Sequence, residues 1–140
     1  MLNGKRIVVL GGTQGIGFAI AAGAAREGAS VVIASSKQAS VDAALARLPA
    51  GSTGHAVDLR SAEAVRQLFD RLEAIDHLAY TAGESLLLAP FAELDLVSAR
   101  QFFELRYWGA LAAVKLNRAP IIQTIPPNKP SRCCRPVPLK

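Results

Sequence analysis

Residues 6–17 read Arg-Ile-Val-Val-Leu-Gly-Gly-Thr-Gln-Gly-Ile-Gly, and this stretch decides the fold. Residues 6–10 form a largely apolar, β-branched run bounded by two glycines, which predicts a buried strand. From Gly15 onward the apolar residues follow a helical spacing that stops at Gly28. Glycines at such a junction allow a sharp turn and let a phosphate group approach the backbone. We therefore expect the first N–H groups of the helix to face a pyrophosphate.

The alternation of strand and helix continues along the chain. Further strands are expected at 30–34, 53–57 and 76–80, and further helices at 41–48, 61–72 and about 98–116. Pro49 is expected to end the second helix and Ser61 to cap the third. Such alternation predicts right-handed crossovers and a parallel sheet that is covered on both faces. The expected class is α/β, a doubly wound Rossmann-type sheet of about four to five strands.

Composition argues against several classes of protein. No stretch reaches the roughly 18 uninterrupted apolar residues of a membrane span, and no signal peptide is expected. The cysteines, Cys133 and Cys134, are adjacent and make no disulfide framework. His55 and His77 have no further ligand at a metal-binding spacing, so no metal site is predicted. We expect a soluble, cytoplasmic protein that spans no membrane and binds no specific nucleic acid.

Two other kinds of site do not fit the motifs. A phosphate loop of the nucleoside triphosphatases needs Lys followed by Ser or Thr after its last glycine, where Phe18 and Ala19 stand. Residues 83–87, Gly-Glu-Ser-Leu-Leu, lack the closing glycine of a hydrolase nucleophile elbow. The segment at 11–17 is therefore interpreted as a dinucleotide-binding turn, with a purely structural turn as the alternative.

Four segments together resemble the short-chain dehydrogenase/reductase family over about residues 5–116. Residues 11–17 resemble its glycine signature, although Leu10 stands where the family usually has Thr. Residues 57–59, Val-Asp-Leu, resemble the adenine-contacting segment after the third strand. Residues 76–83 resemble the fourth strand and its Asn-Asn-Ala-Gly motif, with Tyr and Thr replacing the asparagines. Residues 104–109 resemble the helix that normally carries an active-site Asn, which is Arg106 here.

The resemblance implies a nicotinamide dinucleotide bound at the carboxyl ends of the strands. The expected contacts are Gly11, Thr13, Gln14, Gly15, Ile16, Gly17, Ser35, Ser36, Lys37, Asp58, Leu59, Thr81, Ala82 and Gly83. Residues 34–37, Ala-Ser-Ser-Lys, offer hydroxyls and a cation but no carboxylate, which favours NADP over NAD. The alternative interpretations are structural: Asp58 as the start of a turn before Ser61, residues 82–83 as part of an ordinary loop, and Arg106 as a solvated helix residue.

The family's chemistry, as the resemblance implies it, uses a Tyr and a Lys four residues apart together with a Ser. A Tyr with a pKa near 10 needs a neighbouring cation before it exchanges protons at neutral pH. In this chain Glu84 follows Tyr80 at that spacing and Leu111 follows Tyr107. No catalytic residue is therefore assigned, and we expect a cofactor-binding half that is inactive alone.

The last part of the chain differs in composition from the rest. Residues 115–140 carry six of the 16 basic residues and no acidic one, and six of the eight prolines lie from Pro120 onward. We divide the chain into a dinucleotide-binding domain at 1–116 and an irregular, Pro-rich basic tail at 117–140, in which 121–125 could add a short strand. The hypothesis favoured is a truncated, frameshifted or alternatively ended enzyme, and the alternative is a nucleotide-binding module whose tail binds a partner through 127–132. Self-association is expected through the helix near 98–116.

Overall fold

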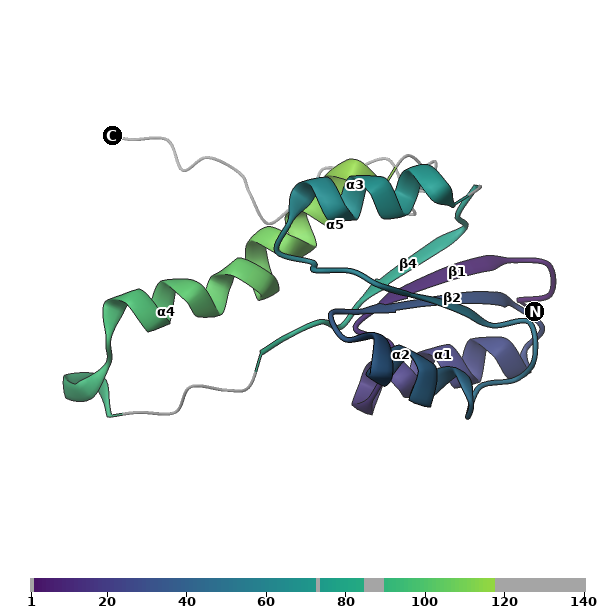
Figure 1. Cartoon of the computed structure of the whole chain (residues 1–140), viewed down its shortest axis with the longest axis horizontal. Helices are drawn as coiled ribbons and strands as arrows, with labels where there is room; N and C mark the ends of the chain where they lie inside the picture. Colours follow the sequence, from purple (N-terminus) through teal and green to yellow (C-terminus); the bar gives the residue numbers. More distant parts are fainter. Residues whose placement is uncertain (1, 73, 85–89, 118–140) are drawn as a thin grey trace, which may run out of the picture.

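The fold is built around one parallel sheet. The computed structural model describes residues 2–72, 74–84 and 90–117. The strands are β1 (Arg6–Leu10), β2 (Ser30–Ser35), β3 (Thr53–Ala56) and β4 (His77–Tyr80). They lie in the order β3-β2-β1-β4 (Figure 1), and Val8 in β1 pairs with Val32 on one side and Leu78 on the other. The chain order reverses between β1 and β4, which is the switch point where α/β sheets bind their ligands.

Helices cover both faces of the sheet (Figure 1). They are α1 (Gly15–Arg26), α2 (Gln38–Leu45), α3 (Ala62–Arg71), the 3₁₀ turn η1 (Phe91–Glu93), α4 (Leu96–Phe103), the π-helical segment η2 (Glu104–Gly109) and α5 (Ala110–Leu116). On one face α1 and α2 pack against the sheet, and on the other α3 and α5 do so. The predicted α/β class and doubly wound parallel sheet are thereby confirmed.

Two apolar cores lie on the two faces of the central strands. Ile7, Val9 and Ile33 point into the core under α1 and α2. Val8 and Val32, which alternate with them, point into the core under α3 and α5. Because both faces are buried, the strand sequences are continuously apolar rather than alternating, as parallel sheets require.

Some predicted boundaries were wrong. The second helix begins at Gln38, not at 41, and ends at Leu45, well before Pro49. Its extra first turn is supported by a 2.7 Å hydrogen bond that the Gln38 side-chain amide donates to Asp42. Residues 46–48 continue as a turn in which the N–H of Leu48 still bonds the carbonyl of Ala44. The predicted cap is confirmed, because the Ser61 hydroxyl accepts a 3.2 Å hydrogen bond from the N–H of Ala64.

The helix predicted at 98–116 is not one regular α-helix. It begins earlier, at Leu96, where the Asp95 carboxylate accepts a 2.8 Å hydrogen bond from the N–H of Ser98. In the middle it widens into the π-helical segment η2 before α5 begins. Figure 1 shows α4 leading away from the sheet, whereas α5 packs beside α3. The predicted strand at 121–125 and nearly all of the tail lie outside the described residues.

Candidate cofactor-binding site

The glycine turn (residues 11–17) is shaped by close backbone contacts. A Cβ on Gly11 would lie 2.5 Å from the backbone nitrogen of Ala82, and a Cβ on Gly17 would collide with the carbonyl of Gly11 and the hydroxyl of Thr81. Gly15 has a φ of +54°, and a Cβ there would meet no atom within 4 Å. The turn therefore packs tightly against β4 on one side and is open at Gly15 on the other.

The amino terminus of α1 faces the open side of this turn. Gln14 is its N-cap residue and makes no side-chain capping hydrogen bond. The first N–H groups of a helix that lacks a cap are available to an anion, and the helix dipole favours negative charge there. The uncapped helix start and the glycine turn thus lie together at one edge of the site, and the binding of a pyrophosphate there stays a prediction.

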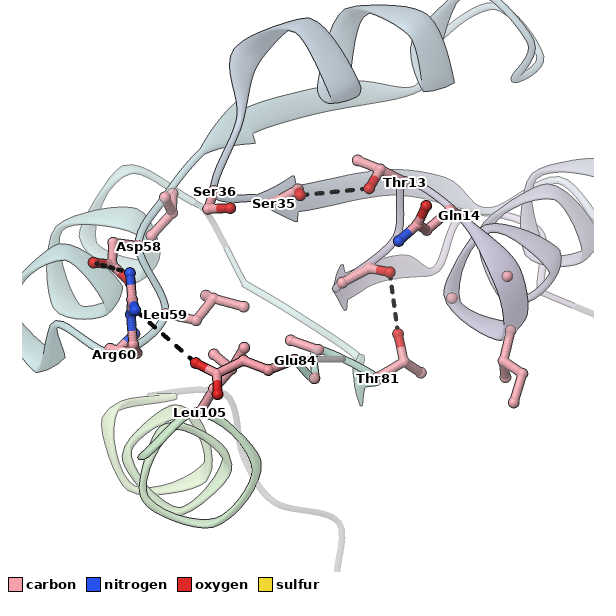
Figure 2. A pocket seen from close by; sticks show the side chains of 17 residues that line it. Thr13, Gln14, Ser35, Ser36, Asp58, Leu59, Arg60, Thr81, Glu84 and Leu105 are labelled. Carbon is pink, nitrogen blue, oxygen red and sulfur yellow. Dashed lines mark hydrogen bonds and ion pairs between the residues drawn. The ribbon is translucent and has the colours of Figure 1, made fainter. Parts of the chain in front are cut away.

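A cavity of about 610 Å³ opens at the carboxyl ends of the strands, beside the glycine turn (Figure 2). Of the fourteen residues predicted to contact a cofactor, all but Lys37 line it. Four lining residues were not predicted: Val57, Arg60, Glu84 and Leu105. Val57 belongs to the segment 57–59 that the resemblance already marked, and Arg60 and Glu84 each come one position after a predicted residue. Leu105 comes from η2, and no local signal places it here.

The end of β2 presents hydroxyl groups to the cavity. Thr13 in the glycine turn donates a 3.4 Å hydrogen bond to the hydroxyl of Ser35 (Figure 2). Ser36 follows with an exposed side chain, and Lys37, also exposed, is the N-cap residue of α2. No carboxylate follows Ser35 before the helix begins, so this end of the cavity does not repel a phosphate.

A chain of charged groups crosses another part of the rim. Figure 2 shows Arg60 between Asp58 and Glu84: its Nε donates a 3.1 Å hydrogen bond to Asp58, and its Nη1 lies 3.9 Å from a carboxylate oxygen of Glu84. The side-chain hydrogen bond from Arg60, followed by one from the Arg60 backbone N–H, lowers the pKa of Asp58. Asp58 is therefore ionised at neutral pH and already has a partner.

The end of β4 is fixed to its neighbours by two hydroxyl groups. The Thr81 hydroxyl lies 3.2 Å from the carbonyls of both Leu10 and Gly11, and these two oxygens share its single hydrogen. The Tyr80 hydroxyl donates a 2.5 Å hydrogen bond to the carbonyl of Leu105. Burial raises the pKa of Tyr80 to about 12, so this phenol holds its proton at neutral pH and serves as a structural donor.

The described part of the chain contains neither a candidate metal site nor a helix that could span a membrane. Among residues 2–72, 74–84 and 90–117, no cluster of His, Cys, Asp and Glu could hold a metal ion. None of the helices in that part of the chain is both long and apolar enough to cross a bilayer.

Fold and site together define an α/β protein of the dinucleotide-binding class. The sequence model of the short chain dehydrogenase family matches residues 5–122, and the chain belongs to this family. Members of the family bind nicotinamide dinucleotides, which is the ligand that the glycine turn predicts.

Similar proteins agree with this assignment. A short-chain dehydrogenase/reductase of an Acremonium species, ucsE, is 44% identical over an alignment 134 positions long that covers 81% of this chain and 50% of that protein. A second one, fsr5 of Gibberella fujikuroi, is 30% identical over 84% of this chain and 50% of its own length. The solved structure of a citronellol catabolism dehydrogenase from Pseudomonas aeruginosa has 28% identity and a TM-score of 0.75, covering 83% of this chain and 50% of that one. The chain thus spans about half the length of the relatives it matches.

Proposed function

We propose that this chain forms the NADP-binding half of a short-chain oxidoreductase. The observation that carries the proposal is the cavity at the switch point, which joins the open glycine turn, the uncapped start of α1 and the ends of all four strands. Its volume of about 610 Å³ lies within the range of pockets that bind small molecules and cofactors. The residues that would contact the adenosine and pyrophosphate groups come from segments that the structure brings together.

The preference for NADP rests on charge at the end of β2. An acid there would hydrogen-bond the ribose 2′-hydroxyl of NAD and repel the 2′-phosphate of NADP. Ser35 and Ser36 stand there instead, and Lys37, an exposed cation at the start of α2, favours an added phosphate.

Binding and catalysis are expected to separate in this chain. The glycine turn supplies the cofactor site, whereas neither tyrosine has a lysine four residues later. Tyr80 is committed to the carbonyl of Leu105, and its raised pKa of about 12 disfavours proton transfer at neutral pH. We expect the purified chain to bind cofactor weakly and to reduce no carbonyl compound.

The test is a calorimetric titration of the purified chain with NADPH and with NAD. The expected result is tighter binding of NADPH; tighter binding of NAD would overturn the cofactor preference. Replacing Ser36 by Asp should weaken NADPH binding about tenfold or more through charge repulsion. Replacing it by Ala is the matched control, because it removes the hydroxyl without adding a charge. Binding of neither cofactor would overturn the function.

A second copy of the chain is the partner that the helical surface favours. Tyr107, Leu111 and Val114 lie three or four residues apart on η2 and α5, and they are 55%, 50% and 50% exposed. A contiguous exposed apolar stripe of this kind marks an interaction surface. Sedimentation should show an associated species whose population falls in Leu111→Glu and persists in Arg26→Glu, a control at an exposed residue of α1 on the other face of the sheet. A monomeric wild-type chain would exclude self-association.

A further inference from the structure

Arg106 reaches from η2 back to the end of β4. Its Nη2 donates a 2.5 Å hydrogen bond to the main-chain oxygen of Glu84. Its guanidinium carbon lies 4.7 Å from the centre of the Phe102 ring, one turn earlier on the helix. A guanidinium over an aromatic face is attracted by the ring and has fewer positions open to it. The Arg106 side chain is therefore held by the ring while it holds the Glu84 backbone.

Gly83 leaves the space that this guanidinium occupies. A Cβ built on Gly83 would lie 2.8 Å from the guanidinium carbon of Arg106, and the three atoms nearest to that Cβ all belong to Arg106. Gly83 does not have a positive φ, so the backbone there accepts an L side chain. An alanine at this position is thus opposed by one side chain rather than by backbone strain.

A second contact runs in the opposite direction between the same two segments. The Tyr80 hydroxyl at the end of β4 donates to the carbonyl of Leu105, the residue before Arg106. One side chain from β4 thus bonds the backbone of η2, and one side chain from η2 bonds the backbone beyond β4. Two contacts of opposite direction fix both the separation and the register of the segments.

We propose that Arg106 is a positioning residue for the cofactor site. The segment that it holds, residues 82–84, lines the cavity, whereas Arg106 itself does not. It acts through Gly83 and the carbonyl of Glu84, and it sets where this wall stands relative to the glycine turn. The proposal rests on the proposed function, since it assigns to the held wall the binding of a nicotinamide dinucleotide.

The first experiment is a cycle of variants measured by amide hydrogen exchange without any cofactor. In Arg106→Ala the hydrogen-bonded amides beside the held wall, above all that of Thr81 on the carbonyl of Leu10, should exchange about tenfold faster, because the charge-assisted hydrogen bond that holds the wall is lost. Gly83→Ala should give a similar acceleration by displacing the guanidinium. The double variant should exchange no faster than Arg106→Ala alone. Arg100→Ala, which removes an exposed arginine of α4, is the matched control and should leave these amides unchanged.

The second experiment repeats the cycle with NADPH in a calorimeter. Arg106→Ala is expected to weaken binding by roughly tenfold, and Gly83→Ala is expected to add little in that background. Fully additive effects, or unchanged exchange at Thr81 in Arg106→Ala, would overturn the positioning role. If the wild-type chain binds neither NADPH nor NAD while the exchange cycle behaves as expected, the cofactor function fails and the contact between Arg106 and the wall stands.

Discussion

The two walls of the cavity are held in place by different kinds of contact. The first wall consists of the glycine turn and the end of β2, which follow strands whose apolar side chains are buried. The glycines of the turn are in close contact with neighbouring backbone atoms. The second wall, residues 82–84 with η2, touches the glycine turn at Ala82 and is otherwise held by hydrogen bonds and ion pairs of exposed or half-buried side chains. Close packing resists the addition of a single methyl group, whereas polar contacts near solvent compete with water. Variants that add side-chain volume should therefore disturb the first wall most, and variants that remove a single hydrogen bond should disturb the second.

The largest expected effect adds a methyl group to the first wall. Gly17→Ala places a Cβ against the carbonyl of Gly11 and the hydroxyl of Thr81, so the free energy of unfolding should fall by about 3 kcal/mol. Gly23→Ala is the control in the same helix, because its Cβ meets no atom within 4 Å. That variant should gain roughly 0.5–1 kcal/mol from helix propensity. Urea unfolding of both measures the difference, and equal effects would show that the turn is not tightly packed.

The open position of the same wall should behave differently. Gly15→Ala meets no neighbouring atom, but its φ of +54° costs an L residue roughly 1–2 kcal/mol of folding free energy. The Cβ also lies beside the cavity, so NADPH affinity should fall more than stability does. Urea unfolding and calorimetry on the same sample separate the two losses. A variant that keeps full affinity would place the phosphate away from Gly15.

On the second wall, Tyr80→Phe removes one hydrogen bond and leaves the carbonyl of Leu105 without its donor. The free energy of unfolding should fall by about 1 kcal/mol at neutral pH, as for a typical buried or half-buried hydrogen bond. Urea titration checks the value. Amide exchange should rise in η2 and remain unchanged in the glycine turn, and a rise in both would contradict independent walls.

The same tyrosine predicts a pH dependence. Burial raises the folded-state pKa of Tyr80 to about 12, above its ordinary value of 10.0. The folded protein therefore binds this proton more tightly than the unfolded chain does, and the associated stability is present below pH 10 and is lost as the pH rises toward 12. Wild type should lose stability faster than Tyr80→Phe over that window. Parallel curves for the two proteins would show that Tyr80 ionises normally.

The smallest effect is expected at the exposed rim. The hydrogen bond from Arg60 lowers the folded-state pKa of Asp58 below 3.8, so its stabilising contribution is present above that value and is lost as the pH falls through the folded-state pKa. Because both side chains are exposed, Asp58→Asn should lower stability only slightly, and mainly at low salt. Thermal unfolding from pH 2 to pH 7 measures it. A large loss at neutral pH in high salt would mean that Asp58 also supports the wall through its backbone turn.

Much of the fold could be predicted because its signals are local. The apolar runs of β1 and β2 were identified as strands from their own residues, and the cap at Ser61 was found from one residue and its neighbours. The boundaries were less accurate, since the start of α2 at Gln38 depends on a side-chain contact with Asp42 that periodicity does not contain. The π-helical segment η2 was likewise not predicted. The carbonyl of Leu105 in this segment accepts a hydrogen bond from Tyr80, a residue 25 positions away, and a local pattern does not contain such a contact.

By itself, the sequence determined the sheet, the glycine turn and the family. Apolar runs and glycine motifs are local signals, and each can be recognised from a few neighbouring residues. Only the tertiary structure decided which polar groups meet across the rim: Arg60 with Glu84, and Arg106 with Gly83. Those partners are 24 and 23 positions apart and are exposed or half-buried. No hydrophobic pattern in the sequence marks these polar pairs. They come together because the chain after β4 returns in η2 to the end of the sheet.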